Sequence, residues 1–113
     1  MLFKIEKLSE ILTKNGILMA KCTAIVPGNP MSVYSFNVDG ILIDTGARSL
    51  VNEFKPYFEQ ADYDAIYLTH FHEDHMGNVS YLQQQRDIPT FIHQMSTHLT
   101  TKPFRIPTYR QVV

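Results

Sequence analysis

The first part of the chain shows short apolar runs separated by turn residues. The run from Ile17 to Val26 predicts a strand, which the breaker cluster at 27–30 (Pro-Gly-Asn-Pro) ends. Val33 to Val38 and Ile41 to Ile43 predict two further strands, joined by Asp39-Gly40, a pair typical of two-residue hairpin turns. Because Ile41 to Ile43 is apolar at consecutive positions, we expect both faces of this strand to be covered.

The middle of the chain alternates helical spacing with short strands. Apolar residues from Leu50 to Phe58 recur at helical spacing, and Pro56 is expected to kink or split that helix. Ala65 to Leu68 and Thr90 to Ile92 predict strands, and Met76 to Gln85 predicts a helix between them. This alternation predicts an α/β fold, with a mixed sheet and helices on one of its faces.

The last part of the chain, residues 95–113, has no clear periodicity and ends without a polar tail. A chain of 113 residues is expected to form one domain, because two independent cores need more residues. We interpret residues 1–113 as a single partial domain that is truncated at its C-terminus.

Composition and charge narrow the functional classes. The apolar share of 44% excludes intrinsic disorder. Ten basic against eleven acidic residues give a net charge of −1, so the chain lacks the basic footprint of a nucleic-acid or membrane binder. No signal peptide is apparent, and the one cysteine, Cys22, is interpreted as buried packing. We therefore expect a cytoplasmic protein without nucleic-acid or membrane partners.

The candidate functional residues lie in the segment 69–77, Thr-His-Phe-His-Glu-Asp-His-Met-Gly. In extended backbone His70, His72 and Asp74 point to the same side, and a turn at the start of the next helix brings His75 alongside. Imidazole and carboxylate suit zinc, and also iron or manganese. Four ligands on one short loop suit two adjacent ions, with His70 and His72 on one and Asp74 and His75 on the other. A solvated polar loop with incidental histidines is the alternative.

This segment resembles the H-x-H-x-D-H metal loop of the metallo-β-lactamase superfamily. Residues 41–46 (Ile-Leu-Ile-Asp-Thr-Gly) are similar to the family's first motif, and residues 65–69 to the strand that leads into its metal loop. The resemblance covers residues 17–93 and implies the N-terminal half of an αββα sandwich. It implies a hydrolase of esters, thioesters, lactones or phosphodiesters that holds two zinc ions in the complete fold.

The same resemblance implies roles for two aspartates. Asp44 would orient the metal loop without touching the metal, whereas the alternative is a plain turn residue at the end of a strand. Asp74 would be a metal ligand that also handles a proton during catalysis.

The chain departs from the family pattern after His75. The family takes its remaining ligands from its C-terminal half, but here only Asp87, His93 and His98 follow, and we interpret both histidines as surface or packing residues. We therefore expect an incomplete metal site, in a chain that self-associates or pairs with a missing half. A non-enzymatic metal-binding or assembly module stays open as an alternative. Nucleic-acid processing, as in the ribonuclease Z branch, is a third hypothesis. The net charge of −1 argues against it.

Overall fold

The structure is a computed structural model that describes residues 6–26, 29–70, 72–93 and 110–112. A seven-stranded sheet, with its strands in sequence order, forms the centre of the molecule. The strands are β1 (Glu6–Lys14), β2 (Ile17–Val26), β3 (Asn29–Val38), β4 (Ile41–Ile43), β5 (Ala65–Leu68), β6 (Thr90–His93) and β7 (Arg110–Val112). The helices are η1 (Arg48–Leu50), α1 (Val51–Gln60), α2 (Glu73–Met76) and α3 (Val79–Gln85). None of the helices in the described ranges is long and apolar enough to span a membrane.

The sheet changes from antiparallel to parallel pairing at β4. Strands β1 to β4 pair antiparallel, and β4 to β7 pair parallel. The β3–β4 turn places Asp39 and Gly40 at φ 49° and 82°, which confirms the predicted hairpin. Parallel neighbours need crossover connections, and α1 supplies the crossover from β4 to β5. The carboxyl ends of β4 and β5 therefore meet at one edge of the sheet.

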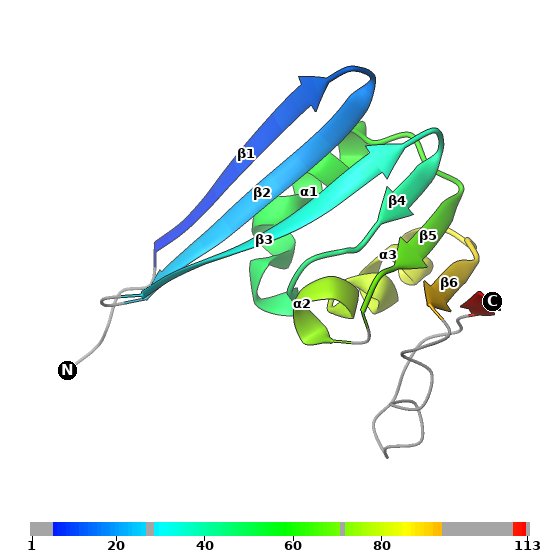
Figure 1. The fold of residues 1–113 in the computed structure, drawn as a ribbon. Helices are drawn as coiled ribbons and strands as arrows, with labels where there is room; N and C mark the ends of the chain where they lie inside the picture. The colour runs from blue at the N-terminus through cyan, green and yellow to red at the C-terminus, as the bar shows by residue number, and fades with distance from the viewer. Residues whose placement is uncertain (1–5, 27–28, 71, 94–109, 113) are drawn as a thin grey trace, which may run out of the picture.

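The helices pack on one face of the sheet, as predicted (Figure 1). Helix α1 buries Phe54, Tyr57 and Phe58 against the sheet, and α3 buries Val79 and Leu82. Burying a side chain of the size of Phe54 or Leu82 stabilises the fold by about 1.5–3 kcal/mol. This face of the sheet contains most of the hydrophobic core.

The opposite face, here called the outer face, carries a continuous apolar row. The strand registers place its members side by side from β1 to β6: Leu12, Met19, Phe36, Ile43, Tyr67 and Phe91. Leu12 is 51% exposed, and Ile41 on the same face is 42% exposed. The expectation that Ile41 to Ile43 is covered on both faces is therefore wrong for the described part of the chain, because only the side of Leu42 is buried.

Helix α1 runs through Pro56 without a break, so the predicted split of this helix is wrong. Proline removes the hydrogen bond to the carbonyl group four residues earlier, at Asn52. Both residues are exposed, so water can hydrate that carbonyl, while the buried aromatic rings hold the helix on the sheet.

Other boundaries also differ from the sequence prediction. The predicted helix from Met76 to Gln85 is two helices, α2 and α3, separated at Gly77 and Asn78. A β-carbon on Gly77 would lie 2.5 Å from the main-chain nitrogen of Arg48, so this close approach needs glycine. Strand β3 begins at Asn29, before the predicted Val33, and strands β1 and β7 were not predicted at all.

Candidate metal centre

The four predicted metal ligands gather beyond the carboxyl end of β5. The imidazole rings of His70 and His75 lie 4.8 Å apart between centroids, and those of His70 and His72 stack at 6.0 Å. Asp74 Oδ2 lies 3.5 Å from His75 Nε2. The structure therefore brings His70, His72, Asp74 and His75 into one patch at the edge of the sheet.

The backbone that presents these side chains differs from the extended segment expected from the sequence. His72 is extended, with φ −128° and ψ 156°, but Asp74 and His75 belong to α2. The amide groups of His75 and Met76 both donate to the carbonyl oxygen of His72, which starts this helical turn. The alternation of side chains expected for an extended segment therefore does not reach Asp74. This residue lies on a helical turn beside His75 and not on an extended strand.

Asp44 lies behind this patch, directly after β4. Its carboxylate accepts hydrogen bonds from the Thr69 amide at 2.8 Å, the Thr69 hydroxyl at 2.7 Å and His75 Nδ1 at 2.9 Å. Because the carboxylate accepts the Nδ1 proton, His75 Nε2 is left with a lone pair. A carboxylate behind an imidazole in this way is the usual support of a metal-ligating histidine.

Thr69 orients His70 in the same manner, a role that the sequence reasoning missed. Its hydroxyl has one hydrogen, which it donates to Asp44, so the oxygen accepts from His70 Nδ1 at 3.1 Å. This leaves the lone pair of His70 on Nε2. The sequence signal for this role was the position of Thr69, a hydroxyl residue between β5 and the first histidine.

Main-chain contacts fix α2 against the segment that follows β4. The amide and hydroxyl groups of Thr45 both donate to the carbonyl oxygen of His75, at 2.7 and 2.9 Å. Asn78, fully buried, donates from Nδ2 to the carbonyl oxygens of Thr45 and Ala47. The position of His75 is thus determined at both its main chain and its ring.

The donor atoms of these side chains, imidazole nitrogen and carboxylate oxygen, are of the kinds that bind zinc. In the described part of the chain, no three histidine, cysteine or acidic side chains are arranged to hold a single ion. Zinc sites usually have three or four protein ligands, so these side chains do not complete a site by themselves. Asp87 is exposed on the surface, and His98 lies outside the described residues. The residues present fit a metal centre that needs further ligands.

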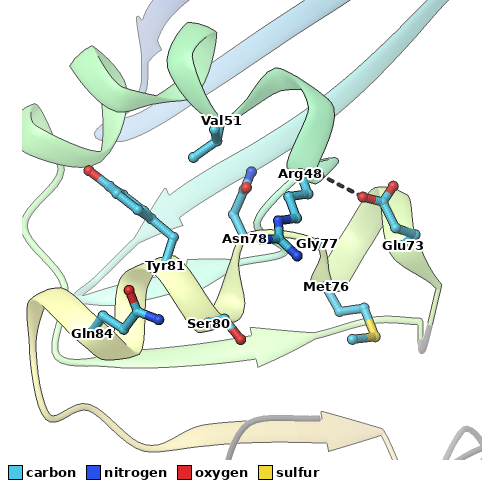
Figure 2. A pocket seen from close by; sticks show the side chains of 9 residues that line it. All are labelled: Arg48, Val51, Glu73, Met76, Gly77, Asn78, Ser80, Tyr81 and Gln84. Atoms are coloured by element: carbon cyan, nitrogen blue, oxygen red, sulfur yellow. Dashed lines mark hydrogen bonds between the residues drawn. The ribbon is translucent and has the colours of Figure 1, made fainter. Parts of the chain in front are cut away.

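Two clefts lie near this region. One, of about 440 Å³, borders Asp74 and His75 and is lined mainly by apolar side chains: Met19, Val33, Tyr34 and Phe36. The other, of about 480 Å³, lies between η1, α1 and the helices α2 and α3 (Figure 2). There the main-chain N–H of Arg48 donates to Glu73 Oε1, and none of the four predicted metal ligands lines this second cleft.

Solved structures with the same fold include two metallo-β-lactamases. FIM-1 from Pseudomonas aeruginosa, in a mono-zinc form, superposes with a TM-score of 0.70 at 18% identity, covering 94% of this chain and 51% of the lactamase. FEZ-1 from Legionella gormanii superposes with a TM-score of 0.54 at 14% identity, covering 86% of this chain and 43% of that enzyme. The chain thus spans about half of these structures, and they share its fold.

Sequence comparison gives the same family. Ribonuclease J of Mycoplasma genitalium is 36% identical over 73 residues, a stretch that covers 55% of this chain and 13% of the ribonuclease. The profile of the metallo-beta-lactamase superfamily matches residues 31–113, which is more than half of the chain and includes the loop with the histidines. The chain therefore belongs to the metallo-beta-lactamase superfamily.

Proposed function

We propose that this chain supplies four metal ligands, His70, His72, Asp74 and His75, to a metal-dependent hydrolase. Its substrates would be small molecules with an ester, thioester, lactone or phosphodiester bond. The hydrogen bond from His75 Nδ1 to Asp44 carries the proposal, because it leaves Nε2 free beside the Asp74 carboxylate. Bound divalent ions would lower the pKa of water to about 7 and polarise the bond to be cleaved.

We assign separate roles to the four ligands and to Asp44. His70 and His72 would hold one ion and Asp74 and His75 the other, with zinc as the first choice and iron or manganese as alternatives. The Asp74 side chain is 51% exposed, so its carboxylate can accept a proton from water and release it to the leaving group. Asp44 would hold the ring of His75 without touching the substrate.

The cleft beside Asp74 and His75 supports a small substrate. Its volume of about 440 Å³ and its lining by Met19, Tyr34 and Phe36 suit a molecule with an apolar group next to the reacting bond. The net charge of −1 favours a substrate other than a nucleic acid.

One comparison favours the phosphodiester class. The relative at 36% identity over 73 residues is a ribonuclease, so a nucleic-acid phosphodiester is the second candidate substrate. The chain itself has no net positive charge for the phosphate backbone, so such a substrate would require a basic surface from elsewhere.

A non-enzymatic assembly module is the second candidate function. The apolar row on the outer face supports it, since exposed apolar surface of this kind favours association with a second copy or a missing half. Such a module would bind metal or a partner without hydrolysing any substrate.

The proposal is tested by hydrolysis with and without metal. The chain, completed by a C-terminal segment as a longer protein or as a co-expressed second chain, is stripped with a chelator and assayed with a phenyl ester, a thioester, a lactone and bis(4-nitrophenyl) phosphate, before and after Zn²⁺, Mn²⁺ or Fe²⁺ is added. A short single-stranded RNA is assayed in parallel. We expect metal to restore hydrolysis of one of the four small substrates.

Two variants and a control link the activity to the loop. His72→Ala should abolish turnover and release metal together, and Asp74→Asn should lower the rate more than the metal content. The control is Asp62→Asn, which removes an exposed carboxylate in the connection between α1 and β5. If His72→Ala keeps the activity and the metal, the loop is not the reaction centre. Cleavage of the RNA alone would support the nucleic-acid candidate, and metal binding without any turnover would support the assembly module.

A further inference from the structure

Asp44 holds an unusual main-chain conformation for a residue with a side chain. Its φ is 62°, in the left-handed region. A residue with a β-carbon is disfavoured there by about 1–2 kcal/mol, although aspartate tolerates it better than most. The surrounding structure must therefore hold this conformation.

A buried hydroxyl on the neighbouring strand contacts the main chain of Asp44. Ser35 Oγ donates to the carbonyl oxygen of Asp44 at 2.7 Å, while the carbonyl oxygen of Ile43 lies farther away, at 3.3 Å. Pairing between β3 and β4 ends at Phe36 and Ile43, one position before Ser35 and Asp44. The serine side chain thus supplies a hydrogen bond at the point where the ladder stops.

A second hydroxyl completes the arrangement from helix α1. The Tyr57 hydroxyl lies 3.0 Å from Ser35 Oγ, and both residues are fully buried. Ser35 has one hydroxyl hydrogen, and the Asp44 carbonyl group can only accept, so Tyr57 donates to Ser35. Burial raises the pKa of Tyr57, which keeps this donor protonated. The result is a chain of hydrogen bonds from Tyr57 through Ser35 to the main chain of Asp44.

We propose that Ser35 and Tyr57 are positioning residues that fix the Asp44 carboxylate behind His75. This inference rests on the proposed function in one respect, namely that His75 is a metal ligand. Without the Ser35 hydroxyl, the buried carbonyl group of Asp44 loses this hydrogen bond, which makes the left-handed conformation less favourable relative to extended backbone. That relaxation rotates the Cα–Cβ bond and moves the carboxylate away from Thr69 and His75.

The test uses NMR spectra of the metal-free 113-residue chain, so it does not depend on hydrolysis. The reporters are the Thr69 amide and the His75 Nδ1 proton, which both donate to Asp44. In Ser35→Ala we expect the imidazole signal to broaden or disappear and the Thr69 amide to move upfield. Tyr57→Phe, which removes only the hydroxyl, should cause a smaller change in the same direction, and Ser35→Thr should restore the original signals.

The matched control is Cys22→Ala, at a fully buried position on β2 that lies on the same sheet face as Ser35. Unchanged reporter signals in Ser35→Ala would overturn the inference, and so would an equal change in Cys22→Ala. If Ser35→Ala does not fold, Tyr57→Phe decides by the same two signals.

Metal affinity separates this inference from the proposed function. Competition with a chromophoric chelator should show weaker Zn²⁺ binding by Ser35→Ala, about threefold to tenfold, below the 10–100-fold typical of direct partners of metal ligands. Changed NMR signals without any Zn²⁺ binding by the unsubstituted chain would support the positioning role and contradict the proposed function. Zn²⁺ binding with unchanged signals would do the reverse.

Discussion

Asp44 and His75 are 31 residues apart in the chain, yet the carboxylate of one accepts a 2.9 Å hydrogen bond from Nδ1 of the other. Asp44 follows β4 and His75 lies in the short helix α2, so the contact joins two separate elements at the candidate site. Its consequences for metal binding can be measured directly.

Asp44→Asn should keep the fold and weaken Zn²⁺ binding by about 10–100-fold, because the amide no longer offers a charged acceptor to His75. Asparagine also tolerates the left-handed conformation, so backbone strain should not change. The measurement is a competition titration with a chromophoric chelator. Asp39→Asn is a matched control, since Asp39 also has a positive φ, of 49°, but lies in a hairpin turn. Equal weakening in both variants would contradict this role of Asp44.

The 113-residue chain should retain less than one equivalent of zinc after exhaustive dialysis. The reason is that the described residues contain no group of three histidine, cysteine or acidic side chains that could hold one ion, whereas zinc sites usually have three or four protein ligands. Metal content measured by mass spectrometry of the acid-digested protein checks this. Retention of two ions by a monomer would show that other residues of the chain complete the site.

Gly77→Ala should destabilise the protein by about 1–3 kcal/mol, since a β-carbon there overpacks a close contact. Its nearest neighbours are main-chain atoms of Arg48 and Glu73, both at 2.5 Å, so relief requires backbone movement. Gly77 has an ordinary φ of −58°, so crowding and not backbone strain is the cause of the expected loss. Gly16→Ala shows the opposite case, because its β-carbon meets nothing within 4 Å but its φ is 79°. Urea unfolding measures both, and a loss well below about 1 kcal/mol for Gly77→Ala would refute the packing argument.

Stability should fall as the pH rises above 9. Burial, with a smaller contribution from Glu53, raises the pKa of the Cys22 thiol from 9.0 to about 12. Between these values the unfolded chain has lost this proton and the folded chain keeps it, so unfolding is favoured by up to about 1.4 kcal/mol per pH unit. Below pH 9 the thiol is protonated in both the folded and the unfolded chain, so stability does not depend on its titration there.

Urea unfolding of the unsubstituted chain and of Cys22→Ala between pH 8 and 11.5 checks this. The variant should lose less stability per pH unit, although its stability at pH 8 is lower. Parallel curves for the two proteins would show that the thiol does not cause the decline.

The sequence predicted the parts of the fold that have a strong hydrophobic pattern. Strand β2 matches its predicted bounds, because Ala20 and Cys22 are buried within a long apolar run. Strand β1 escaped prediction because its apolar residues Leu8 and Leu12 lie on the exposed outer face among charged neighbours. The Asn15-Gly16 pair, whose φ values are 53° and 79°, was the local signal for its hairpin.

From the residues alone, the candidate site was predicted only where its members are neighbours in the sequence. The spacing of the histidines identified the loop, and the resemblance to the family identified Asp44. Ser35 and Tyr57 could not be found in this way, because they meet across 22 residues and from different elements. A serine in a strand and a tyrosine in a helix carry no pattern that distinguishes them from packing residues.

The change from antiparallel to parallel pairing at β4 has a consequence for the order of folding. Strands β1 to β4 join through hairpins, whereas Asp44 reaches Thr69 only after α1 has crossed over and β5 has paired with β4. Contacts between distant residues form more slowly than local ones, so we expect the hairpins to appear first in refolding. A chain at that stage would already show strand content by circular dichroism while its histidines are still unconnected to Asp44. Recovery of strand signal would therefore precede recovery of the metal centre.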